Sequence, residues 1–111
     1  MSNKQINPER WEEFFDQFTN GNRGRLIKLE IVAPERGDQI PLQNAPLWSL
    51  VYNSVNRDND LTISTGREEV TYAHTIHTPK TVWEALDQNG KVVALEIVDE
   101  SKTQTILHLK G

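Results

Sequence analysis

Two histidines three positions apart, His74 and His77, are the first side chains in this sequence that could do chemistry. With His108 as a third ligand, their imidazoles could bind zinc. On a regular strand, however, positions three apart face opposite sides, and only a bend near Pro79 would bring the two rings together. We therefore predict no metal site. His74 shares a predicted strand face with Tyr72, so it is either a pocket residue or a histidine at the edge of the core, hydrogen-bonded to backbone.

Glu84 is the second candidate, because the predicted hairpin places it on an otherwise apolar face. A carboxyl group buried there without a partner would have a raised pKa and could act as a general acid or base. The alternative is that the apolar face ends near Glu84, or that a bulge turns the side chain outward. No phosphate-binding loop, nucleophile elbow or paired-carboxylate motif accompanies it, so the sequence points to no cofactor and argues against an enzyme.

The aromatic residues outside the helix suggest a contact surface. Trp83 is predicted opposite Glu96 and away from the core face, where an exposed tryptophan would suit a binding role. The simpler interpretation is that it covers the second layer of a sandwich or packs under the N-terminal helix. The net charge of −4 argues against nucleic acid as the partner. A stacking platform for bases would need four aromatic residues to converge: Trp48, Tyr52, Tyr72 and Trp83.

The N-terminal part of the chain is predicted to form a single amphipathic helix that packs on the strands carrying these residues. Asn7 and Pro8 form a start signal, and the Asn20-Gly21 pair is a stop signal, so we expect a helix over about residues 8–19. Its aromatic stripe repeats at helical spacing and should be buried, with Ile6 packing onto its first turn. The stripe consists of Trp11, Phe14, Phe15 and Phe18.

The chain from about residue 25 to 109 is predicted to be antiparallel strands, because β-branched and aliphatic residues recur between turn signals. The stretch 40–46, which contains two prolines, should be a loop or an edge segment, and 48–55 a strand. Asn89-Gly90 predicts a two-residue hairpin that pairs Val82 with Ile97 and Leu86 with Val93. A three-residue loop over 100–102 would then bury Leu107 and turn His108 outward.

Length and composition favour one domain over residues 1–111. The absence of cysteine fits a reducing compartment, and no apolar run could span a membrane or serve as a signal segment. We therefore expect a cytoplasmic protein. Its fold class is expected to be α+β, with the helix packed on a bent antiparallel sheet of five to seven strands, a small barrel or sandwich.

The order and spacing of several short segments resemble a family of small bacterial proteins of unknown function, over nearly the whole chain. This resemblance implies a bacterial origin and a single helix-plus-sheet domain, and it brings no catalytic residues. Ser101-Lys102 stands where the resemblance leads us to expect Asp-Gly in the last hairpin. The segments are the helix with Trp11 and Phe15, 26–32, 45–47, 74–76 with Pro79 and Val82, 94–97, and 103–107.

These observations favour a small non-enzymatic binding or protein-interaction domain, with a protein partner or a second copy, associating through a sheet edge or through Trp48 and Trp83. The alternative is a small-ligand-binding or enzymatic barrel with a pocket near His74 and Glu84, walled by Tyr72 or Trp48.

Overall fold

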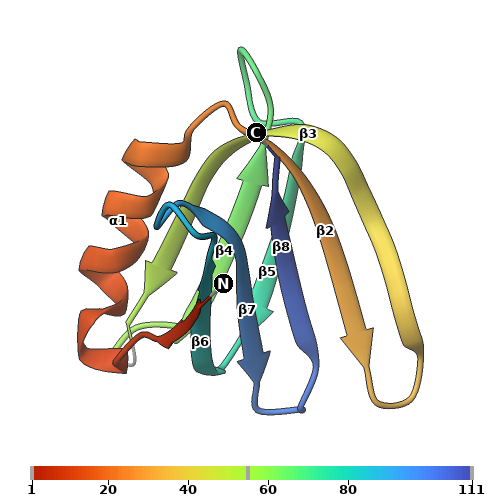
Figure 1. Ribbon diagram of the computed structural model, residues 1–111. Helices are drawn as coiled ribbons and strands as arrows, with labels where there is room; N and C mark the ends of the chain where they lie inside the picture. Colours follow the sequence, from red (N-terminus) through yellow and green to blue (C-terminus); the bar gives the residue numbers. More distant parts are fainter. Residues whose placement is uncertain (1, 55, 111) are drawn as a thin grey trace.

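The computed structural model describes residues 2–54 and 56–110, so Val55 of the predicted strand 48–55 lies outside the described residues. The fold is α+β, with one helical segment and an antiparallel sheet of eight strands (Figure 1). The elements are β1 (Ser2–Gln5), η1 (Pro8–Arg10), α1 (Trp11–Asn22), β2 (Leu26–Ala33), β3 (Gly37–Asn53), β4 (Asp60–Thr65), β5 (Tyr72–His77), β6 (Pro79–Leu86), β7 (Val92–Asp99) and β8 (Gln104–Leu109).

The sheet has the order β1-β6-β7-β8-β2-β3-β4-β5 and is not closed. The strand count of five to seven was therefore wrong, chiefly because β1, a short polar strand, has no hydrophobic pattern that reveals it. A closed barrel was wrong as well, because the end strands β1 and β5 do not pair with each other in the described part of the chain. Strand β3 bends sharply, pairing with β2 through its first half and with β4 through its second (Figure 1).

The helical segment begins where the sequence predicts and ends later. The Asn7 side chain accepts a hydrogen bond from the Glu9 amide at 3.0 Å, and Pro8 opens the 3-10 turn that leads into α1. The helix continues through Asn20-Gly21 to Asn22, and the chain reverses at Gly24, which has a φ of 91°. Tertiary contact explains the extra turn, since Thr19 is held against β3 and keeps the end of the helix docked.

The aromatic stripe of α1 is buried as predicted. Trp11, Phe15 and Phe18 all belong to the core, and Phe14 is half-buried beside them. Ile6 is also buried, and its carbonyl accepts a hydrogen bond from the Trp11 indole. The helix lies alongside the second half of β3, as Figure 1 shows.

The C-terminal strands confirm most of the predicted register. Val82 pairs with Ile97, and Leu95 pairs with Leu107. The Asp99 amide donates to the Thr103 carbonyl, which closes the predicted three-residue loop, 100–102. The Asp87 amide likewise donates to the Lys91 carbonyl, so the loop at Asn89-Gly90 has three residues, 88–90, rather than the predicted two. A register shift therefore follows Ala85, and Leu86 lies opposite Val92 instead of Val93. Both turns begin with an aspartate whose carboxylate accepts two backbone amides, which favours this longer loop.

Candidate functional site

Trp83 lies on the outer face of the sheet and is 38% exposed. The register places it next to Glu96 of β7, which in turn lies next to Ile106 of β8. Around these side chains is a shallow depression of about 360 Å³ that we call the Trp83 surface. It is lined by Asn3, Trp83, Glu84, Ala85, Ala94, Glu96 and Ile106.

Trp48 lies apart from the Trp83 surface, and the predicted joint surface of the two tryptophans is not one pocket. Trp48 borders a different and smaller pocket near Gly66, and the Arg23 guanidinium lies 5.9 Å from the centre of its ring. The Arg23 side chain also donates a hydrogen bond to the Trp48 carbonyl. This cation–π contact engages one face of the indole.

Tyr52 and Tyr72 pack against the hydrophobic core, so they do not extend a platform of exposed rings. The ring of Tyr52 meets that of Trp11 edge to face, with centroids 5.4 Å apart, and burial raises the pKa of its hydroxyl. The stacking platform considered for nucleic acid therefore does not form from these four aromatic residues.

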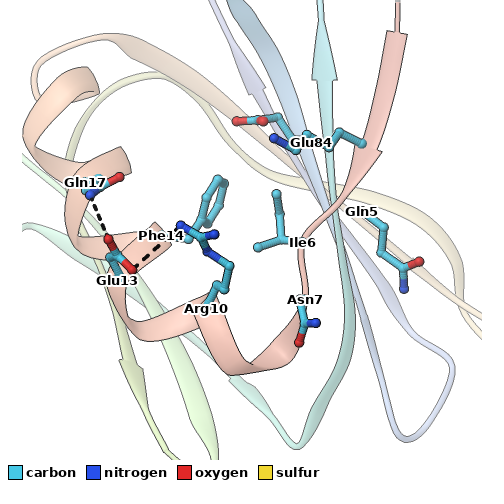
Figure 2. Close-up of a pocket in the computed structure, with 9 residues that line it drawn as sticks. Gln5, Ile6, Asn7, Arg10, Glu13, Phe14, Gln17 and Glu84 are labelled. Atoms are coloured by element: carbon cyan, nitrogen blue, oxygen red, sulfur yellow. Dashed lines mark hydrogen bonds and ion pairs between the residues drawn. The ribbon is translucent and has the colours of Figure 1, made fainter.

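Glu84 has the inward register position on β6 that the hairpin predicts, opposite Leu95, but it is only half-buried and also borders the Trp83 surface. It borders a pocket of about 330 Å³ between β1, η1 and α1 (Figure 2). Ile6 and Phe14 lie between Glu84 and the ion pair formed by Arg10 and Glu13, whose charged atoms are 3.9 Å apart. This pocket therefore presents both signs of charge beside apolar side chains. Its lining residues are Lys4, Gln5, Ile6, Asn7, Arg10, Glu13, Phe14, Gln17 and Glu84.

His74 lies on the inner face of β5, opposite Ile63, and does not line the pocket that Glu84 borders. Burial lowers the pKa of His74, and the nearby His77 lowers it further. The alternation of the strand turns His77 to the opposite, exposed face, as predicted. Within residues 2–54 and 56–110, no group of three or more His, Asp or Glu side chains is arranged to hold a metal ion.

A cluster that the sequence did not suggest lies on the outer face of β2, β3 and β8. The His108 ring and the Glu30 carboxylate are hydrogen-bonded at 2.8 Å. Hydrogen bonds from His108 and from Asp38 lower the pKa of Glu30, while the same contact with Glu30 raises the pKa of Asp38. His108 points outward as predicted, but its partner comes from a strand 78 residues earlier in the chain. Only knowledge that β2 pairs with β8 could have revealed this contact.

A family model for a family of unknown function, DUF5335, matches residues 2–111. The chain belongs to this family. Among curated proteins it is similar to an uncharacterized protein of Aquifex aeolicus (strain VF5), with 34% identity over 110 residues that cover 99% of this chain and 94% of the relative. No solved structure matches the chain significantly.

Membership in DUF5335 confirms the resemblance stated from the sequence, and the relative is bacterial. Neither the family nor the relative carries an assigned activity. In the described part of the chain, none of the helices has both the length and the apolar character needed to cross a bilayer.

Proposed function

We propose that this DUF5335 domain is a non-enzymatic protein-interaction domain that binds another protein through the Trp83 surface. The observation that carries the proposal is the exposed indole of Trp83 within a shallow depression whose lining combines Ala85, Ala94 and Ile106 with the carboxylates of Glu84 and Glu96. Tryptophan is among the residues that contribute most binding energy when a partner covers them, and a depression around it lets the partner exclude water. We further propose the cytoplasm as its compartment, supported by the absence of cysteine.

Charge indicates the chemistry of the partner. Glu96 lies in the Trp83 surface, and Glu30 is next to Ile106 on the neighbouring strand. A partner segment with an apolar side chain flanked by Lys or Arg would fill the depression and pair with these carboxylates. The whole domain carries a net charge of −4, which would also speed its encounter with a basic surface.

The positions of the candidate acid and base support a binding role over catalysis. A general acid and a general base must both reach the same bound substrate, directly or through one water, so they must share one site. Glu84 borders the pocket beside α1, whereas His74 faces inward from β5 and does not line that pocket. The proposed interaction therefore needs no participation of His74.

A second candidate function is favoured by the pocket that Glu84 borders. Its volume of about 330 Å³ would accommodate a small molecule, and it combines Lys4 and Arg10 with Glu13 and Glu84 over an apolar floor. A ligand with both an amino and a carboxylate group, such as a free amino acid or dipeptide, would match this pattern. Titrating the protein with dipeptides and following the Glu84 and Phe14 backbone amides by NMR tests this candidate.

Affinity capture from a bacterial lysate, quantified by mass spectrometry, tests the proposed protein interaction. The baits are the wild-type domain, Trp83→Ala, Glu96→Lys and a control, Val51→Ala, whose side chain is 49% exposed but lies outside the Trp83 surface. We expect a captured protein that is lost with the first two variants and kept with the control. Loss of the tryptophan should weaken binding about 30-fold or more, the range of an interface hot spot. An identical set of proteins on the wild-type and Trp83→Ala baits would refute the proposal.

A further inference from the structure

Strand β5 ends the sheet, and the hydrogen bonds around it show which backbone groups are left open. The Thr19 hydroxyl donates to the Leu50 carbonyl and accepts from the Leu50 amide, so both groups of Leu50 point away from β4. Leu50 and Ile63 are therefore a non-hydrogen-bonded pair, and Ile63 points its own amide and carbonyl toward its β5 partner, His74.

The alternation along β5 follows directly from that pair. His74 uses its backbone groups on β4, so those of Ala73, Thr75 and His77 point away from the sheet. The amide of Thr78, four residues after His74, points the same way and donates to the Asn59 carbonyl at 2.9 Å. This bond supports the inward direction of His74 and the outward direction of its neighbours. Every second residue, 73, 75 and 77, thus presents an open backbone amide and carbonyl along the edge. The side chains of these three residues are exposed.

The other two free edges carry features that discourage pairing, and β5 carries none of them. The free half of β3 contains Pro41 and shifts of register, and Asn44 in it has a φ of 55°. β1 has only four residues, one of them Lys4. Prolines, bulges, charges and short length are the usual protections of an edge strand. β5 has six residues in continuous register with β4 and contains no proline, lysine, arginine or acidic residue.

We propose that β5 is a self-association site, where it pairs antiparallel with β5 of a second copy about a two-fold axis at Thr75. In this arrangement Thr75 faces Thr75 of the other copy, and Ala73 faces His77, so that the open groups make about six backbone hydrogen bonds. A second copy fits this edge, because pairing about Thr75 matches every open donor with an acceptor and brings no acidic, lysine or arginine side chain of β5 against its like.

The outer face of the paired strands supports the same axis. The hydroxyls of Thr62 and Thr75 are 3.0 Å apart, a cross-strand threonine pair of the kind that stabilises sheets. Two-fold pairing at Thr75 continues this row into the second copy. One short strand from each copy buries less area than a permanent dimer requires, so the association should be weak and concentration-dependent.

Sedimentation equilibrium over a concentration series tests the self-association. We expect the wild-type mass to rise toward that of a dimer, and Thr75→Lys, which places two ammonium groups opposite each other at the axis, to weaken association at least about tenfold. Val51→Lys is the control, since it adds the same charge to an exposed position of β3 away from the edge. Equal denaturation midpoints for the two lysine variants separate lost association from lost folding.

The absence of native cysteine allows a second, positional test. Residues directly opposite in a hydrogen-bonded antiparallel pair have Cα atoms about 5.5 Å apart, within the range that a disulfide spans. We expect Thr75→Cys to form a disulfide-linked dimer under mild oxidation much faster than Val51→Cys. A wild-type mass that stays monomeric at all concentrations, or association that Trp83→Ala abolishes and Thr75→Lys leaves intact, would overturn the proposal. The latter result would leave the Trp83 surface as the interaction site.

Discussion

At the scale of single residues, Thr19 shows how one hydroxyl can replace a missing strand. The Leu47 amide and carbonyl still bond Arg25 and Gly24, but further along β3 has no strand on this side, and the amide and carbonyl of Leu50 would be unsatisfied under the helix. The Thr19 hydroxyl fills this gap, because it bonds both the amide and the carbonyl of Leu50, at 2.9 and 3.2 Å. Thr19 is buried, so water cannot take its place.

Replacing Thr19 with valine should therefore lower the free energy of unfolding by about 1–3 kcal/mol, the cost of leaving buried polar groups without partners. Chemical denaturation measures the change. Thr81→Val is a matched control, because Thr81 lies on β6 opposite Val98 and valine suits an outer strand position. An equal loss in both variants would mean that the effect comes from side-chain shape and not from the hydrogen bonds to Leu50.

The cluster of Glu30, Asp38 and His108 predicts that the stability of the fold depends on pH. Because the hydrogen bond from His108 lowers the pKa of Glu30 below its ordinary value, the ionised carboxylate stabilises the fold above that ordinary value. Its contribution is lost as the pH falls through the lowered pKa. The raised pKa of Asp38 acts in the opposite sense, with a cost that grows as the pH rises and Asp38 ionises beside Glu30.

Side-chain carboxyl ¹³C titration by NMR checks these directions. We expect Glu30 to titrate below, and Asp38 above, their ordinary values, and His108→Gln to move the pKa of Glu30 upward. An unchanged Glu30 titration in that variant would show that the contact with His108 does not persist in solution.

At the scale of elements, the helix depends on its docking. Twelve residues are too few for α1 to be stable alone, so its aromatic stripe must supply the stability. Phe15 is 1% exposed and Phe14 is half-buried beside it, with ring centroids 5.3 Å apart. Phe15→Ala should cost about 3–5 kcal/mol and Phe14→Ala clearly less, measured as the shift in the denaturation midpoint. Equal, small shifts would indicate that the helix is not docked on the core.

The two hairpins of the C-terminal half share one turn design but differ at one position. Gly90 occupies the left-handed position of the first turn, with a φ of 81°, and Lys102 occupies the equivalent position of the second, with a φ of 66°. A side chain is strained in this region, whereas glycine is not. Lys102→Gly should therefore stabilise the domain by about 1 kcal/mol, while Gly90→Lys should destabilise it by a similar amount. Thermal denaturation measures both, and two shifts of the same sign would contradict the shared design.

At the scale of the whole molecule, the bend of β3 joins the two parts of the sheet into one unit. Both parts contribute to a single hydrophobic core, with Leu50 and Ile63 from one side and Leu95 and Leu107 from the other. We expect one cooperative unfolding transition, because neither part has a core of its own. Far-ultraviolet circular dichroism and tryptophan fluorescence should give the same midpoint, and two separated transitions would contradict this expectation.

The sequence by itself determined the elements whose signals are local. The aromatic stripe from Trp11 to Phe18, the Asn7 cap and the alternation through residues 82–97 follow from spacing and turn chemistry within a few residues. For the same reason it placed Glu84 on the inner face and His108 on the outer one. Predicted boundaries were wrong where tertiary contacts override local propensity. At Gly21 the sequence predicts the end of the helix, but the helix continues because Thr19 is docked on Leu50.

Only the tertiary structure decided which strands are neighbours, and with them the candidate sites. The pairing of β1 with β6, of β2 with β8, and the change of partner along β3 join segments far apart in the chain, and no local pattern encodes them. These pairings separate His74 from the Glu84 pocket, bring Glu30 to His108, surround Trp83 with a shallow depression and leave β5 at the edge. Periodicity determines which face of a strand is apolar, but the packing of the whole core determines what lies beside it.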